Sequence, residues 1–188
     1  MHPRLEEVLN YLDAQRSSLR EAVELVPPAL RDQAPGTDRW SVAEVLQHLV
    51  LIEKRIGLGV TKWISEARAA GLGPETETSS VMNSLPLQLI SDRTERKSAP
   101  EQVSPRGDLD AASAWTALEQ TRAVLRAAAL AGDGLALGKV IQPHLVLGPI
   151  NIYQWLLFVG SHEARHAAQV REIAAELNSS ATTATSAN

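Results

Sequence analysis

Apolar residues recur three and four positions apart over most of this chain, the spacing of one face of an α-helix. Four segments carry this pattern and end near proline or glycine: residues 2–26, 41–71, 110–130 and 151–177. Alanine and leucine, which favour helices, supply 27 and 25 of the 188 residues. The strand signal is confined to short fragments such as Val140-Ile141. The sequence therefore predicts an all-α protein.

Three of the predicted helices have recognisable start signals. Ser41-Val42-Ala43-Glu44 is a capping-box pattern, in which the serine oxygen accepts from a backbone amide and the glutamate reaches back to the cap. Either Asp108 or Asp110 can cap the third segment. Asn151 can open the fourth, with Gln154 as its capping partner. These signals fix the order and approximate ends of the helices.

The connections between the helices differ greatly in length. Residues 74–110 lose the helical period and contain several prolines, so this long connection is functional or partly disordered, with a short helical piece only around residues 87–93. Residues 135–149 are apolar with glycine and proline and are predicted to form a packed loop. We therefore expect a four-helix bundle with a long crossover between helices 2 and 3. Residues 1–178 form one domain, and residues 179–188, only Ser, Thr, Ala and Asn, form a disordered tail.

Composition excludes several classes of function. The formal charge is −4, from 18 basic and 22 acidic residues without a basic run, so no nucleic-acid partner is expected. No apolar run approaches the roughly 20 residues of a membrane helix, and acids stand near the N-terminus where a signal peptide is apolar, so we expect a soluble cytoplasmic protein with no membrane partner. The absence of cysteine excludes disulfides, cysteine-ligated metals and a cysteine nucleophile.

Three histidines are the strongest candidates for chemistry. His162 and His166 are four apart, about 40° around a helix and roughly 6 Å apart at Cβ, and both lie on the apolar stripe. His48 also borders an apolar stripe, three residues after Val45 and four before Ile52. One interpretation is hydrogen-bonded core histidines. The other is a metal site, because three neutral imidazoles leave positions open for water or substrate; zinc, nickel, iron and manganese all fit such a set.

Other polar residues carry weaker signals. Glu163 and Arg165 point about 100° away from one or the other neighbouring histidine, which predicts a solvated face. Arg93, Lys97 and Arg122 either hold an anionic group near the site or lie on the surface. The sequence has no G-x-S-x-G elbow, P-loop or dinucleotide glycine signature, and it lacks the paired Glu-x-x-His motifs of di-iron bundles.

Three stretches of the chain share a pattern with a known group of helical bundles. The first, residues 40–49, holds a tryptophan, a capped helix start and His48; the second, residues 93–100, reads R…K…AP. The third, residues 148–155, reads GPINIYQW and is followed by His162 and His166. Over residues 3–177 the chain resembles the DinB-like superfamily, which includes metal-dependent thiol transferases. Some members carry an HP pair before the GP turn, whereas here the order is Pro143-His144, so we expect an ordinary loop histidine.

The resemblance implies a metal site and two kinds of activity. His48, His162 and His166 would be the ligands of one divalent transition metal ion. The protein would transfer a low-molecular-weight thiol, necessarily a cofactor, onto a small-molecule electrophile, or it would be a metal-dependent hydrolase. A non-enzymatic stress-related binding module with a structural or absent metal is the other alternative, and a homodimer is implied. The pocket walls are expected from residues 93–100, residues 142–149 and the tryptophans.

Overall fold

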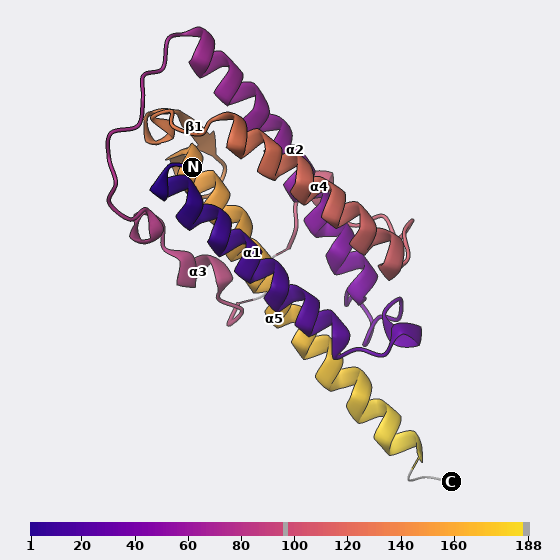
Figure 1. The fold of residues 1–188 in the computed structure, drawn as a ribbon. Coiled ribbons are helices and arrows are strands. Elements are labelled where there is room, and N and C mark those ends of the chain that lie inside the picture. Colours follow the sequence, from indigo (N-terminus) through magenta and orange to yellow (C-terminus); the bar gives the residue numbers. More distant parts are fainter. Residues whose placement is uncertain (96–97, 186–188) are drawn as a thin grey trace.

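Four long helices build the protein, as predicted. The computed structural model describes residues 1–95 and 98–185, with side chains through residue 179. The long helices are α1 (Pro3–Glu24), α2 (Val42–Ala69), α4 (Ala111–Ala131) and α5 (Ile152–Thr185). Helix α1 packs along α5 and α2 packs along α4 (Figure 1). The all-α prediction is confirmed, and none of the described helices is long and apolar enough to cross a membrane.

The predicted start signals are present in the structure. The Ser41 hydroxyl accepts from the Glu44 amide at 3.2 Å, and the Ser41 amide donates to the Glu44 carboxylate at 2.8 Å. Of the two candidates for the third long helix, Asp110 is the cap, and its carboxylate accepts from the Ser113 amide at 2.7 Å. Asn151 and Gln154 exchange two hydrogen bonds at the start of α5, at 2.9 and 3.0 Å. Side-chain oxygens thus satisfy amides that the helices leave unpaired.

The crossover from α2 to α4 is folded against the bundle. It contains two turns of 3-10 helix (Met82–Ser84 and Glu101–Val103) and the short helix α3 (Leu87–Ser91), close to the piece predicted at residues 87–93. Helix α3 packs on α5. Lys97, a candidate for holding an anion, lies outside the described residues. The crossover therefore covers one side of α5.

Two segments differ from the sequence prediction. Residues 135–149 were expected to form a loop, but they contain part of the antiparallel hairpin of β1 (Ile141–His144) and β2 (Gly148–Asn151). Pro143 and Pro149 are paired across the hairpin. Proline has no backbone N–H to donate to a neighbouring strand and is uncommon within sheets, so its presence argued against predicting strands here. Helix α5 continues to Thr185, beyond the predicted end near Leu177, because no proline or glycine stops it. Of the predicted tail, residues 186–188 lie outside the described residues.

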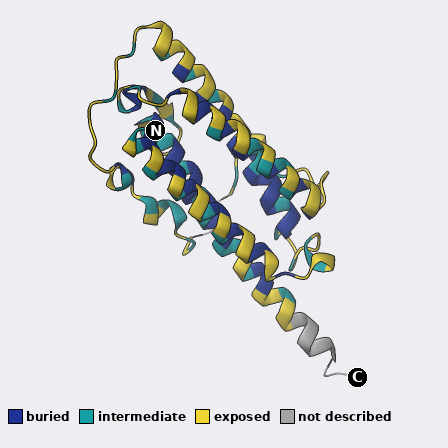
Figure 2. Ribbon diagram, viewed as in Figure 1, coloured by how far each residue is buried: buried dark blue, intermediate teal, exposed yellow. Residues whose placement is uncertain are grey.

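The interior of the bundle is divided into two apolar clusters. One lies toward the hairpin and includes Leu9, Val60 and Leu156; the other lies toward the opposite end and includes Leu19, Leu46 and Val170. Figure 2 shows the buried residues on the inward faces of the long helices. Between the two clusters lie four buried charged residues that pair with one another, one from each long helix. We call this set the ionic layer: Arg16, Glu53, Arg122 and Glu163.

Candidate metal centre

The structure brings the three candidate histidines together. His48 comes from α2, and His162 and His166 come from successive turns of α5. The Nε2 atom of His162 lies 3.4 Å from His48 Nε2 and 3.3 Å from His166 Nε2. One ligand atom from each residue can be chosen so that all three lie within 4.8 Å of one another. We call these three residues the histidine cluster.

Hydrogen bonds fix the tautomers of two of these histidines. His48 Nδ1 lies 2.7 Å from the Val103 carbonyl oxygen, which can only accept, so this nitrogen carries the proton. His166 Nδ1 lies 2.8 Å from Gln169 Oε1, and Arg93, which can only donate, faces the same oxygen at 3.5 Å. The Nε2 lone pairs of His48 and His166 therefore both point toward His162.

Burial keeps all three imidazoles neutral. It lowers the pKa of His162 to about 3, with smaller contributions from the neighbouring His48, Arg165 and His144. Burial likewise brings the pKa of His166 well below its usual value and lowers that of His48, although the Val103 carbonyl acts in the opposite direction. Neutral imidazole is the form that binds metals.

Two of the three nitrogen–nitrogen distances in the histidine cluster have the length expected at a metal site. Two ligands at the 2.0–2.1 Å typical of zinc lie about 3.3–3.4 Å apart when the ion is tetrahedral. The two Nε2 distances at His162 have this length. Without a cation, imidazole lone pairs would face one another in a buried place, and only one of them could accept a proton from His162. The histidine cluster is thus a donor set that could hold a divalent transition metal.

Aromatic side chains surround the histidine cluster. The ring centroid of Trp40 lies 5.1 Å from that of His48 and 6.4 Å from that of His166. Phe158 stacks on His162 with centroids 5.5 Å apart and an interplanar angle of 23°. His48 and His166 are buried, but His162 is only partly buried. His162 is therefore the one member of the histidine cluster that is partly exposed.

Residues from the crossover and the hairpin lie near the histidine cluster. The crossover contributes the Val103 carbonyl and Arg93, which also donates to Glu172 at 2.7 Å. The hairpin contributes His144, whose ring centroid lies 4.5 Å from that of Phe158. His144 Nδ1 accepts from the Val146 amide at 3.2 Å, so this histidine serves the hairpin turn and lies outside the histidine cluster.

The ionic layer corrects the predictions for Glu163 and Arg122. Glu163, expected on a solvated face, is 2% exposed, and Arg122 is buried beside it. Arg16 donates to Glu163 at 2.5 Å and to Glu53 at 2.9 Å; Arg122 donates to Glu163 at 2.6 Å and also to Glu53. Burial lowers the pKa of Arg122, but the carboxylates of Glu163 and Glu53 outweigh it and raise that pKa overall. Every charge in the layer therefore has two partners of opposite sign within the layer, and Arg16 also pairs with the exposed Glu119 at 3.2 Å.

Arg165 is also buried, contrary to the predicted solvated face. Its side chain donates to the Glu95 carbonyl at 2.7 Å, under the crossover. Glu163 and Arg165 are buried for the same reason. Helix α5 is in contact with α1, α2 and α3, so it has no solvated face around residues 163–165.

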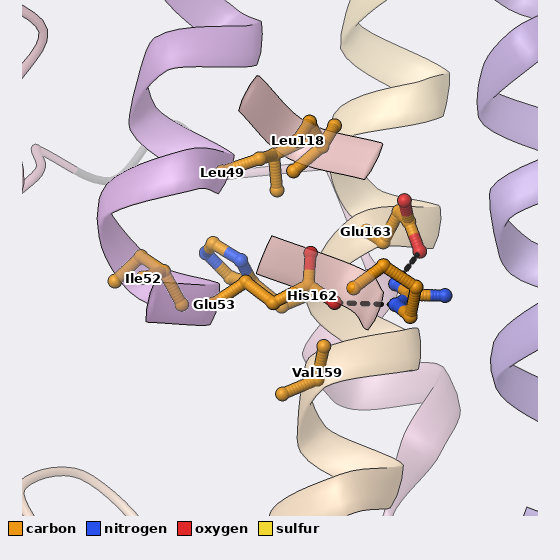
Figure 3. Close-up of a pocket in the computed structure, with 8 residues that line it drawn as sticks. Leu49, Ile52, Glu53, Leu118, Val159, His162 and Glu163 are labelled. Atoms are coloured by element: carbon orange, nitrogen blue, oxygen red, sulfur yellow. Dashed lines mark hydrogen bonds and ion pairs between the residues drawn. The ribbon is translucent and has the colours of Figure 1, made fainter. Parts of the chain in front are cut away.

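A small cavity separates the ionic layer from His162. Its volume is about 10 Å³, and Figure 3 shows His162, Glu53 and Glu163 among its lining residues. A larger cavity of about 320 Å³ lies toward the hairpin and is lined by residues that include Arg4, Glu75 and Tyr153. No member of the histidine cluster borders this larger cavity.

Two hydrogen-bond partners of the histidines were not predicted. Gln169 follows His166 by three residues on the same helix face, and this spacing is the signal that could have identified it. Val103 acts through its backbone carbonyl, which any residue type supplies, so the sequence holds no signal for it.

Comparison with known proteins identifies the family of this chain. A family model described as the DinB superfamily matches residues 11–170. The chain belongs to the DinB superfamily. The matched range of this DinB protein contains the whole histidine cluster and the whole ionic layer. The uncharacterized protein YuaE of Bacillus subtilis (strain 168) is 31% identical over 143 residues, which cover 76% of this chain and 82% of the relative. No solved structure matches the chain.

Proposed function

We propose that this DinB protein binds one divalent transition metal ion through His48, His162 and His166 and transfers a low-molecular-weight thiol onto an electrophile. The observation that carries the proposal is the convergence of three neutral imidazoles beside a partly exposed His162. Structural metal sites are usually closed by four protein ligands, whereas catalytic sites have three and an open position. The histidine cluster has the catalytic number.

The thiol is a co-substrate, because the chain contains no cysteine. A bound divalent cation would lower the pKa of a thiol that coordinates it, so that the sulfur reacts as a thiolate. The sulfur then forms a bond to the electrophilic carbon while the bond from that carbon to its leaving group breaks. The thiol proton passes to solvent. A chlorinated aromatic compound gives a thioether and chloride, whereas an epoxide gives a thioether whose opened oxygen takes up a proton and remains attached as a hydroxyl group.

The residues around the cluster have positioning and shielding roles. Val103 and Gln169 hold two of the imidazoles with their Nε2 atoms directed inward. Trp40 and Phe158 provide apolar surfaces that suit an apolar electrophile and limit the access of water.

The nearby carboxylates of the ionic layer are not free to act as a general base. A hydrolase commonly uses a free carboxylate or histidine as general base. The two carboxylates of the ionic layer, Glu53 and Glu163, are each held by two arginines. A thiol whose proton is already lost to solvent needs no such base.

The test compares metal-stripped protein with protein reloaded with zinc, nickel, iron or manganese. Each sample is assayed with several cellular thiols and either a chlorinated aromatic compound or an epoxide, and separately with esters and amides. We expect product only when both metal and thiol are present. Product from esters without thiol would show a hydrolase, and inactivity of metal-loaded protein toward all substrates would favour a binding module.

A matched pair of variants controls this assay. His162→Gln removes a member of the histidine cluster and should abolish the metal-dependent product. His144→Gln removes a histidine outside the cluster and should retain metal binding. Equal metal binding by the two variants would contradict the proposed site.

A further inference from the structure

Each imidazole of the histidine cluster has a second ring nitrogen that needs a partner. His48 Nδ1 is hydrogen-bonded to the Val103 carbonyl, and His166 Nδ1 is hydrogen-bonded to the Gln169 side chain. His162 Nδ1 is buried and has no hydrogen-bond partner within the described part of the chain. Metal-binding histidines almost always donate this second N–H to a carboxylate, a carbonyl or a water molecule. The third histidine therefore lacks a partner of the kind that the other two have.

The small cavity lies where such a partner would be. His162 lines it, and its volume of about 10 Å³ is close to the smallest space that holds one water molecule. The apolar part of the wall consists of Leu49, Ile52, Leu118 and Val159, none of which can accept a hydrogen bond from His162 through its side chain. The polar part belongs to the ionic layer: Glu53, Arg122 and Glu163.

Glu53 is the acceptor best placed on the other side of the cavity. Figure 3 shows the Glu53 side chain next to His162 and the Glu163 carboxylate farther from it. Adjacent residues on a helix point about 100° apart, so Glu163 faces away from His162. Glu53 receives one hydrogen bond from Arg122, one from Arg16 at 2.9 Å and one from Thr121 at 3.3 Å. A carboxylate has about four acceptor positions, so one remains.

The geometry points to a buried water site in this cavity, in which the water accepts from His162 Nδ1–H and donates to the Glu53 carboxylate. Glu53 is then a positioning residue that acts through the water. It holds the His162 tautomer whose Nε2 lone pair faces His48 and His166. The ionic layer and the histidine cluster would thus be joined by one hydrogen-bonded path. The effect on metal binding rests on the proposed function, but the water site does not.

A high-resolution crystal structure of the wild-type protein tests the water site directly, with or without metal. We expect one water molecule within about 2.7–3.2 Å of both His162 Nδ1 and a Glu53 carboxylate oxygen. An empty cavity, or a water molecule bonded to Glu163 in place of Glu53, would overturn the inference. Failure of the protein to bind metal would overturn the proposed function alone.

Metal affinity of two variants tests the role of Glu53. Glu53→Gln and Glu163→Gln each remove one charge from the ionic layer at nearly constant size, so they are matched for damage to that layer. Zinc affinity is measured by competition with a coloured chelator on samples that circular dichroism shows to be folded. We expect Glu53→Gln to weaken zinc binding about 10- to 100-fold and Glu163→Gln to weaken it several-fold less. Equal losses in the two variants would overturn the role of Glu53; if Glu53→Gln does not fold, the wild-type crystal structure decides.

Discussion

The ionic layer and the histidine cluster are two polar groups buried in the same bundle, but only one of them is complete by itself. In the ionic layer each arginine has two carboxylates and each carboxylate has two arginines, so the charges cancel. In the histidine cluster, lone pairs of neutral imidazoles face one another, and one ring nitrogen has no partner among the described residues. A buried polar group that is satisfied by its neighbours holds a fold together. One that is not satisfied indicates a ligand.

Breaking the ionic layer should have the largest effect on stability. Arg122→Met leaves Glu53 and Glu163 with Arg16 as their remaining partner in the layer, and an uncompensated buried charge costs about 3–5 kcal/mol. Urea denaturation of metal-free protein measures the loss. The control is Arg126→Met, which removes the exposed pair with Asp13 at 2.9 Å and should cost less than about 1 kcal/mol. Equal losses in the two variants would mean that the ionic layer is not a structural element.

Removing a member of the histidine cluster should strongly lower metal affinity and barely change stability. His166→Gln should lower metal affinity about 100-fold or more, because loss of a ligand exceeds the 10- to 100-fold effect of an outer-shell change. The free energy of unfolding of the metal-free protein should change by less than about 1 kcal/mol. Dialysis against metal, followed by elemental analysis, gives the affinity. If His166→Gln unfolded as readily as Arg122→Met, the two groups would not differ as described.

Acid should destabilise the metal-free protein through the histidine cluster. The three histidines have folded-state pKa values below the ordinary 6.5, chiefly because of burial, so the unfolded chain binds more protons as the pH falls below about 6.5. Stability should therefore decrease from pH 6.5 to pH 5, where exposed carboxylates remain ionised. Urea midpoints across this range measure the slope. A variant with all three histidines replaced by glutamine should show a much flatter dependence; an unchanged slope would locate the titration elsewhere.

The smallest effect should come from the start of α2, which precedes both polar groups on that helix. Ser41→Ala removes the hydroxyl that accepts from the Glu44 amide and should cost about 1 kcal/mol of stability. Metal affinity should barely change, since the helix continues to hold His48. Thermal melts compare this variant with Ser65→Ala, an exposed position inside α2 where alanine is neutral or favourable. Similar melting temperatures for the two variants would show that the cap contributes nothing.

The sequence was sufficient for the helices and for the pairing of His162 with His166, because both follow from spacing along one segment, whereas the addition of His48 rested on the resemblance to a known family. The ionic layer also left a signal. Arg16 follows Leu12 by four and precedes Leu19 by three, and Glu53 has the same relation to Leu49 and Ile56. A charged residue thus occupies a core position in each long helix. Spacing alone does not give the register between helices, so the sequence could not show that these four charged residues lie at the same level of the bundle.

The partners of the histidines show a second limit. The Val103 carbonyl is supplied by the crossover, and its position depends on how residues 74–110 fold rather than on the type of residue 103. The hairpin that carries His144 was hidden because two of its paired residues are prolines. Backbone groups and long connections are placed by tertiary packing, which the periodicity of the helices does not encode.

X-ray absorption at the metal edge of the reloaded protein tests the central claim most directly. If the unsatisfied histidine cluster is a metal site, the wild-type protein will retain one ion per chain after dialysis, with imidazole scattering from three histidines and nitrogen ligands at about 2.0–2.1 Å for zinc. His166→Gln should lose the ion or lower the imidazole number. Failure of the wild-type protein to retain metal, or a ligand shell without three imidazoles, would contradict the account.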